Sequence, residues 1–208
     1  MLAQSLRDLD QRTSDIEKLP DGRTKFGSYV SGSPKVVIEA WDAGVQSFTN
    51  NDFQSALLNF QRGINAVEAS KQSGAIIEMG GGVMADGEAR LCAMAAECSI
   101  QLHSNNLANE FAEKAVNMDS SPQYKILLTE TTANLAVQNI RSNNLESAFG
   151  LYQMAITNYE SIANDNTNKM PKFEEVRLYD EVANLALYLG RTNEADKWRK
   201  TLQEITSE

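Results

Sequence analysis

Few side chains in this chain could carry out covalent chemistry. His103 is the only histidine among the 208 residues, and Cys92 and Cys98 precede it at spacings that do not bring a thiol and an imidazole onto one helix face. A catalytic base near neutral pH would therefore have to be His103 alone. The Ser104-Asn105 sequence beside it favours a solvent-exposed turn histidine, so we predict that the protein is not an enzyme.

The two cysteines favour a structural role. They stand six residues apart in one predicted helix, which separates them by about 120° around the helix and too far along its axis for a disulfide. Free cysteine is among the most frequently buried residues. We therefore expect both thiols in the core.

Two loop motifs suggest ligands but lack key residues. Four residues have the 1-3-5-12 spacing of a calcium loop: Asn164, Asn166, Asn168 and Glu175. The first ligand is Asn rather than Asp, and Lys169 replaces the glycine of the turn. The run Gly80-Gly81-Gly82 lacks the Lys-Ser/Thr and the preceding strand of a phosphate loop. We therefore predict no metal and no cofactor, and interpret residues 71–87 as a glycine-rich insertion.

The charge balance narrows the classes of partner. Nineteen basic and 28 acidic residues give a net charge of −9, the wrong sign for binding nucleic acid through its phosphates. No apolar run is long enough to cross a bilayer, so no integral membrane segment is expected. The first nineteen residues resemble neither a secretory signal nor a transit peptide. These features predict a cytoplasmic protein, or an organelle-matrix protein if a presequence was removed.

The most informative pattern is a repeat of 27 residues, at 41–67 and again at 133–159. Apolar or small residues follow the spacing of one buried helix face in both copies. They are Phe53, Ala56, Leu57, Phe60, Gly63, Ile64 and Val67 in the first copy, and Leu145, Ala148, Phe149, Tyr152, Ala155, Ile156 and Tyr159 in the second. A hairpin that cannot bury its own face implies stacking into a solenoid.

The chain as a whole is predicted to be all-α, a helical-hairpin solenoid of about four antiparallel helix pairs. Residues 1–34 are predicted to form an N-terminal helix, with Leu2, Leu6, Leu9 and Ile16 on its apolar face, and an extended linker from Pro20. Residues 35–208 are predicted to form four hairpins, at about 35–69, 86–119, 123–162 and 172–205. Asp52 or Asn51 is expected to cap the second helix of hairpin one, and Asp86 the first helix of hairpin two. Hairpin two is the most degenerate copy, and no segment has strand periodicity.

Hairpins one and three resemble tetratricopeptide repeats. The matching residues are Ala43-Gly44, Phe48, Asn51-Asp52, Phe53, Ala56, Phe60 and Gly63-Ile64, and then Leu135-Ala136, Ile140, Asn143-Asn144, Leu145, Ala148, Tyr152 and Ala155-Ile156. Hairpin four matches more loosely through Ala183, Leu187, Gly190, Ala195 and Trp198. The matching alanines Ala56, Ala148 and Ala195 are 92 and 47 residues apart. The family's repeat unit is about 34 residues, so the longer spacing is typical of a divergent member with longer helices.

The resemblance implies a scaffold or adaptor that holds a protein or peptide partner in a concave groove, with no covalent chemistry. The groove positions carried over from the family are Ile38, Trp41, Val45 and Phe48 in hairpin one, and Glu130, Ala133, Val137 and Arg141 in hairpin three. Trp41 is the strongest candidate for an exposed anchor, because tryptophan dominates interface hot spots. The alternative is that Trp41 packs against a neighbouring helix.

Other roles remain open at this level. A subgroup of the family clamps the acidic C-terminus of chaperones, but Trp41 and Val45 stand here where its Lys and Asn are required, and Ala93 or a neighbour occupies the next Asn position. Chaperone-tail binding is therefore disfavoured. The alternatives are a small-molecule or lipid-binding domain, or a regulatory enzyme subunit, that uses a cavity between hairpins, and a trafficking adaptor whose N-terminal helix touches a membrane. A homo-oligomer is also compatible with the sequence.

Overall fold

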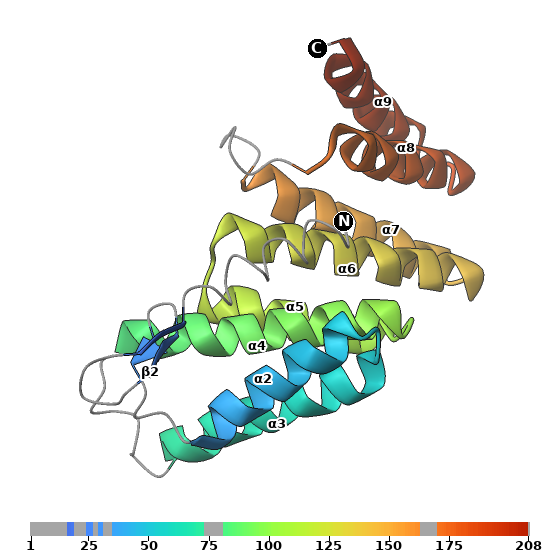
Figure 1. The fold of residues 1–208 in the computed structure, drawn as a ribbon. Coiled ribbons are helices and arrows are strands. Elements are labelled where there is room, and N and C mark those ends of the chain that lie inside the picture. The colour runs from blue at the N-terminus through green and yellow to red at the C-terminus, as the bar shows by residue number, and fades with distance from the viewer. Residues whose placement is uncertain are drawn as a thin grey trace. The chain divides into compact units, whose positions relative to one another are not determined.

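The computed structural model describes residues 16–18, 24–26, 29–30, 35–72, 81–162 and 170–207. Its fold is all-α, as predicted, and consists of helical hairpins (Figure 1). The helices within the described residues are α2 (Lys35–Thr49), α3 (Phe53–Gln72), α4 (Gly81–Gln101), α5 (Asn105–Met118), α6 (Pro122–Arg141), α7 (Leu145–Glu160), α8 (Lys172–Tyr188) and α9 (Thr192–Ser207). Asp86, the predicted N-cap, lies inside α4, because the helix continues through Gly81 and Gly82, each of which costs a helix only about 1 kcal/mol.

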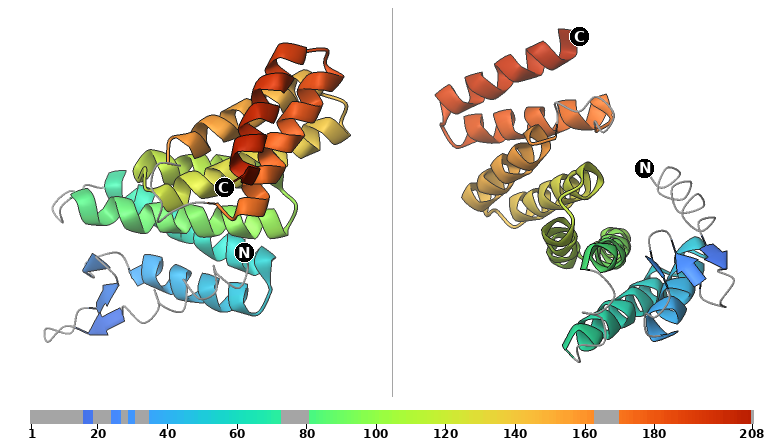
Figure 2. Two further views of the ribbon diagram at one scale, coloured as in Figure 1. Left: turned by 90° about the horizontal axis from the view of Figure 1, so that it is seen from above. Right: turned by 90° about the vertical axis from the view of Figure 1, so that its left-hand side faces the viewer.

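The chain divides into two compact units. The first contains the described residues up to Ser104 together with Asn117–Asp119, and the second contains Asn105–Val116 and the described residues from Ser120 onward. In the first unit α3 packs against both α2 and α4. In the second unit α6 lies beside α7 and α8 lies beside α9, each pair antiparallel, and α7 also contacts α8 (Figures 1 and 2).

The same turn occurs four times between successive helices. Its left-handed residue is Asn51, His103, Asn143 or Gly190, with φ between 56° and 73°. In each turn this residue donates its N–H to the carbonyl three positions back, and the next residue donates to the carbonyl five positions back, at N···O distances of 2.8–3.0 Å. This is the Schellman arrangement, which satisfies the last carbonyls of a helix. Asn and His tolerate the left-handed region better than most side chains, and Gly best.

The turns set a common register for the helices that follow. Five residues after each left-handed residue stands a buried alanine: Ala56, Ala108, Ala148 and Ala195. The sequence pattern indicated that hairpin two is the most degenerate copy, whereas Ala108 occupies the same register as the other three alanines. The predicted cap of α3 is Asp52, whose Oδ1 accepts the N–H of Ser55 at 3.1 Å. Hydrogen bonds from Ser55 lower the pKa of this exposed carboxyl.

A small antiparallel sheet precedes the helices and corrects the expectation that no segment forms a strand. Its strands are β1 (Ile16–Lys18), β2 (Thr24–Phe26) and β3 (Tyr29–Val30), in the order β1-β2-β3. Ile16 pairs with Phe26, and Lys25 pairs with Val30. The Thr, Phe, Tyr and Val of β2 and β3 favour strands, but two or three residues are too few to show a periodicity. Leu2, Leu6 and Leu9 of the predicted N-terminal helix lie outside the described residues, whereas Ile16, assigned to the same helix face, lies in β1. Strands β2 and β3 also replace part of the predicted extended linker.

Close helix crossings build the core of the first unit. A Cβ added at Gly44 of α2 would lie 2.6–2.9 Å from the ring of Phe60 on α3, and one at Gly63 would lie 2.9 Å from Leu91 on α4. Phe60 is fully buried and packs edge to face against Trp41, with ring centroids 5.7 Å apart. The two glycines therefore let neighbouring helices approach more closely than alanine would.

The second unit has an aromatic core and a buried polar contact. Phe149, Tyr152 and Tyr159 of α7 belong to one buried cluster with residues of α6, α8 and α9. Between α5 and α6, Asn109 accepts hydrogen bonds from Thr131 (3.3 Å) and Thr132 (2.8 Å). Because a buried polar group is costly unless it is paired, these bonds fix how α5 packs on α6.

Two helical glycines provide a matched test of these crossings. We expect Gly44→Ala to lower the free energy of unfolding by about 1–3 kcal/mol, because the buried Phe60 ring cannot move away. We expect Gly150→Ala in α7 to raise it by about 0.5–1 kcal/mol, since an added Cβ meets nothing within 4 Å and Ala is the better helix former. Urea denaturation of both variants measures the difference. An equal effect of the two substitutions would contradict the close approach of α2 and α3.

Candidate interaction surface

The groove positions predicted on α2 lie largely in the core. Trp41 is only 7% exposed and contacts Phe60, and Phe48 is buried against Phe53 with ring centroids 5.4 Å apart. Ile38 and Val45 are half-buried. The structure therefore places Trp41 and Phe48 where they hold α2 on α3, which matches the alternative stated for Trp41.

The positions predicted on α6 differ among themselves in exposure. Ala133 is buried, Glu130 and Val137 are half-buried, and Arg141 is exposed at the end of the helix. Val137 also packs against the core of the second unit. Of this set, Arg141 offers the most accessible side chain.

Among the described side chains, the most exposed aromatic ones lie on α8, which the sequence pattern did not single out. Phe173 is 68% exposed and Tyr188 is 77% exposed. Between them Arg177, Asp180 and Asn184 are exposed too, and at 100° per residue all five side chains fall within an arc of about 80°. We call these five residues the α8 face. Their 4-3-4-4 spacing was visible in the sequence, but hairpin four matched the repeat family too loosely to direct attention there.

Hydrogen bonds between tyrosines and carboxylates hold α8 against α7. Tyr152 donates to Glu181 at 2.5 Å, and Tyr179 donates to Glu160 at 3.2 Å. Burial, reinforced by these carboxylates, raises the pKa of both phenols well above the ordinary value of 10. Burial and the nearby Glu175 raise the pKa of Tyr159 in the same way. The hydroxyls of Tyr152 and Tyr179 therefore stay protonated and act as donors.

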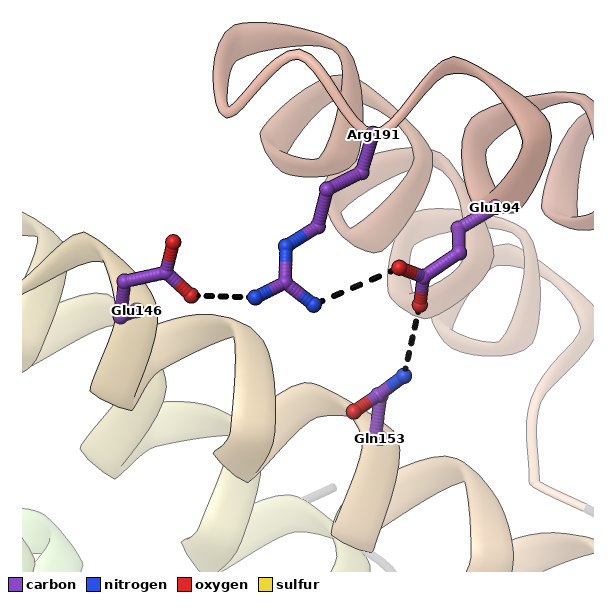
Figure 3. A network of polar contacts seen from close by, with 4 residues as sticks. All are labelled: Glu146, Gln153, Arg191 and Glu194. Atoms are coloured by element: carbon purple, nitrogen blue, oxygen red, sulfur yellow. Dashed lines mark hydrogen bonds and ion pairs between the residues drawn. The ribbon is translucent and has the colours of Figure 1, made fainter.

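A second polar contact fixes the turn between α8 and α9 onto α7 (Figure 3). Arg191 donates to Glu146 of α7 at 2.6 Å and to Glu194 of α9 at 3.3 Å, and Glu194 accepts from Gln153 of α7 at 3.1 Å. The guanidinium also lies over the Phe149 ring, 4.6 Å from its centroid. One side chain thus joins hairpins three and four through an ion pair and a cation–π contact.

The residues considered for catalysis are not assembled into a site. Cys92 and Cys98 are both buried, as predicted, and burial together with Glu97 raises the pKa of the Cys98 thiol to about 12. His103 is the exposed left-handed residue of its turn. Across residues 35–72, 81–162 and 170–207, no group of three potential metal ligands occurs. The suggested calcium ligands Asn164, Asn166 and Asn168 lie outside the described residues.

The suggested phosphate loop and the possibility of a membrane-spanning helix can both be compared with the helices of the structure. Gly81 and Gly82 of the suggested phosphate loop are the first residues of α4. None of the helices in the part of the chain that the structure describes combines the length and hydropathy needed to cross a bilayer.

Comparisons with known proteins add likeness at the level of the fold. No protein-family model matches the sequence, and neither does any curated protein sequence. Among solved structures, MamA is 15% identical with a TM-score of 0.38, over 83% of this chain and 93% of MamA. The apo form of RapI is 10% identical with a TM-score of 0.49, over 99% of this chain and 63% of RapI. Aspartyl phosphate phosphatase F from Bacillus subtilis is 13% identical with a TM-score of 0.42, over 83% of this chain and 51% of the phosphatase. Identities and TM-scores this low do not assign a function.

The Arg191 contacts predict a local effect on hairpin four. Arg191→Ala should lower the free energy of unfolding by about 1–2 kcal/mol, because it removes one cation–π contact and two partly exposed ion pairs. Hydrogen exchange should increase mainly in residues 172–207. Arg199→Ala, which removes an exposed arginine of α9, is the matched control and should change stability by less than about 0.5 kcal/mol. Equal exchange in the two variants would contradict the role of Arg191.

The tyrosine contacts predict a dependence on alkaline pH. The pKa of Tyr152 is raised in the folded state, so above pH 10 the unfolded chain loses this proton first and stability falls as pH rises. Near pH 7, Tyr152→Phe should cost about 1–3 kcal/mol. Above pH 10 this difference should shrink by up to about 1.4 kcal/mol per pH unit. Urea denaturation at pH 7 to 11 measures the difference in free energy of unfolding between the wild type and Tyr152→Phe, with Tyr188→Phe at an exposed position as the control. A difference that does not change with pH would contradict the raised pKa of Tyr152.

Proposed function

We propose that this chain is a non-catalytic interaction module that binds a segment of a partner protein through the α8 face, as a subunit of a larger assembly. The observation that carries the proposal is the pair of rings, Phe173 and Tyr188, exposed at the two ends of one helix face. Large exposed apolar side chains that share one face mark interaction sites more often than single scattered ones do.

The chemistry of the α8 face suits recognition of a polypeptide. Aromatic rings supply apolar anchoring area at a small cost in side-chain entropy. Arg177, Asp180 and Asn184 between them offer both donors and acceptors for polar groups of the partner. At 1.5 Å per residue, the rings stand about 22 Å apart along the helix, which spans six or seven residues of an extended peptide.

The surroundings of α8 support binding without a large ordering cost. Glu181 and Tyr179 of α8 are bonded to Tyr152 and Glu160 of α7, so the helix is held on both edges. A face that is rigid before binding loses little conformational entropy on binding. Of the predicted α6 positions, the exposed Arg141 and the half-buried Glu130 and Val137 stay a proposed extension of the surface, since α6 is also the first helix of a hairpin.

Affinity purification from the source cell, with mass spectrometry of the retained proteins, tests the proposal. We expect the double variant Phe173→Ser/Tyr188→Ser to lose a partner that the wild-type chain retains, while both chains keep the same melting temperature within a few degrees. Leu58→Ser is the matched control, because Leu58 is a 57% exposed apolar residue of α3 in the other unit. Retention of every partner by the double variant would exclude the α8 face.

A further inference from the structure

Helix α4 contains two starting points in its sequence. In the structure it begins at Gly81, whereas Asp86 is one of the residue types preferred at the N-cap of a helix. A helix that begins after Asp86 places Glu88 in its first turn, where a carboxylate interacts favourably with the helix dipole. Residues 81–85 therefore distinguish a longer form of α4 from a shorter form that is capped by Asp86.

The residues that distinguish the two forms are weak helix formers. Gly81 and Gly82 each disfavour a helix about fivefold relative to alanine. Extension of a helix by one good helix former is favoured by a factor of only about 1.6 at most. The shorter form avoids both glycines and gains the cap of Asp86, which favours it by about a further fivefold. Local propensity thus favours the shorter form, although the structure has the longer one.

The part of α4 that is common to both forms is held in place. Glu88 is buried and accepts a hydrogen bond from Lys71, in the last turn of α3. Ala89, Leu91 and Cys92 are buried as well. Because a buried carboxylate is costly without its cation, this ion pair fixes the helix on α3 from Glu88 onward. Unwinding from the amino-terminal end of α4 therefore stops before Glu88.

We infer that α4 is a conformational switch, which exchanges between a longer form that begins at Gly81 and a shorter form that is capped by Asp86. The exchange changes the length of the connection from α3. Residues 81–85 span about 7.5 Å in a helix and up to about 17 Å when extended. The connection thus gains about 9 Å of reach while residues 88–101 stay packed on α3. A partner that binds one form more tightly shifts the balance toward that form.

Amide hydrogen exchange, measured residue by residue by NMR on the full chain, tests the inference. In the longer form the N–H groups of residues 85–87 donate to the carbonyls of residues 81–83, whereas in the shorter form these carbonyls lie outside the helix. From Arg90 onward each N–H has its helical partner in both forms. We expect residues 85–87 to exchange at least about tenfold faster than residues 91–95. Equal protection of the two segments overturns the inference.

Two substitutions at Asp86 separate a capped second start from ordinary fraying of a helix end. Asn and Val resemble Asp in helix propensity, but Asn is a good N-cap and Val is a poor one. We expect residues 85–87 to be about fivefold better protected in Asp86→Val than in Asp86→Asn, because the shorter form loses its cap. Equal protection in the two variants overturns the capped shorter form.

Two glycines provide a second matched pair. Gly82 is helical only in the longer form, whereas Gly87 is helical in both forms. Gly82→Ala should therefore raise the protection of residues 85–87 about fivefold, while Gly87→Ala should leave it nearly unchanged. An equal effect of the two substitutions means that α4 frays progressively, which overturns an exchange between two defined starts.

Discussion

The structure depends on one backbone constraint, the left-handed residue at the end of each first helix. Asn51, His103, Asn143 and Gly190 each turn the chain back so that the following helix begins at a fixed rotation. A fixed rotation places a buried alanine at the same position of the following helix every time. Helix length can therefore vary without loss of register, which explains how hairpins of irregular length still belong to one kind of repeat.

The hairpins are joined to one another by different means. In the first unit the contact of α3 with α4 is apolar and close, with Gly63 against Leu91. In the second unit α7 meets α8 and α9 through an aromatic core edged by tyrosine–carboxylate bonds and by Arg191. Hydrogen bonds and ion pairs require a particular geometry. The polar contacts between α7 and hairpin four therefore fix the position of hairpin four on hairpin three more strictly than apolar packing alone would.

The sequence predicted the hairpins well because a buried helix face repeats every three or four residues over long stretches. It did not predict the sheet, since strands of two or three residues carry no period. It named Trp41 as the best candidate for a groove anchor, with packing against a neighbouring helix as the alternative. The family's positions indicate which helix lines a groove, whereas the burial of a side chain depends on its neighbour, here Phe60. The α8 face was missed for a related reason. Phe173 and Tyr188 differ from core aromatics in rotation alone, and their rotation becomes informative only when the helix boundaries are known.

The distribution of the two tryptophans has a practical consequence. Trp41 lies in the first unit against Phe60, and Trp198 lies in the second against Tyr179, with ring centroids 6.0 Å apart. Each indole is buried, so its emission shifts when its surroundings open to water. Each unit thus carries one tryptophan, and replacing either tryptophan by phenylalanine leaves the remaining one as a spectroscopic reporter of its own unit. The folding cooperativity of the two units is therefore accessible by fluorescence without any added label.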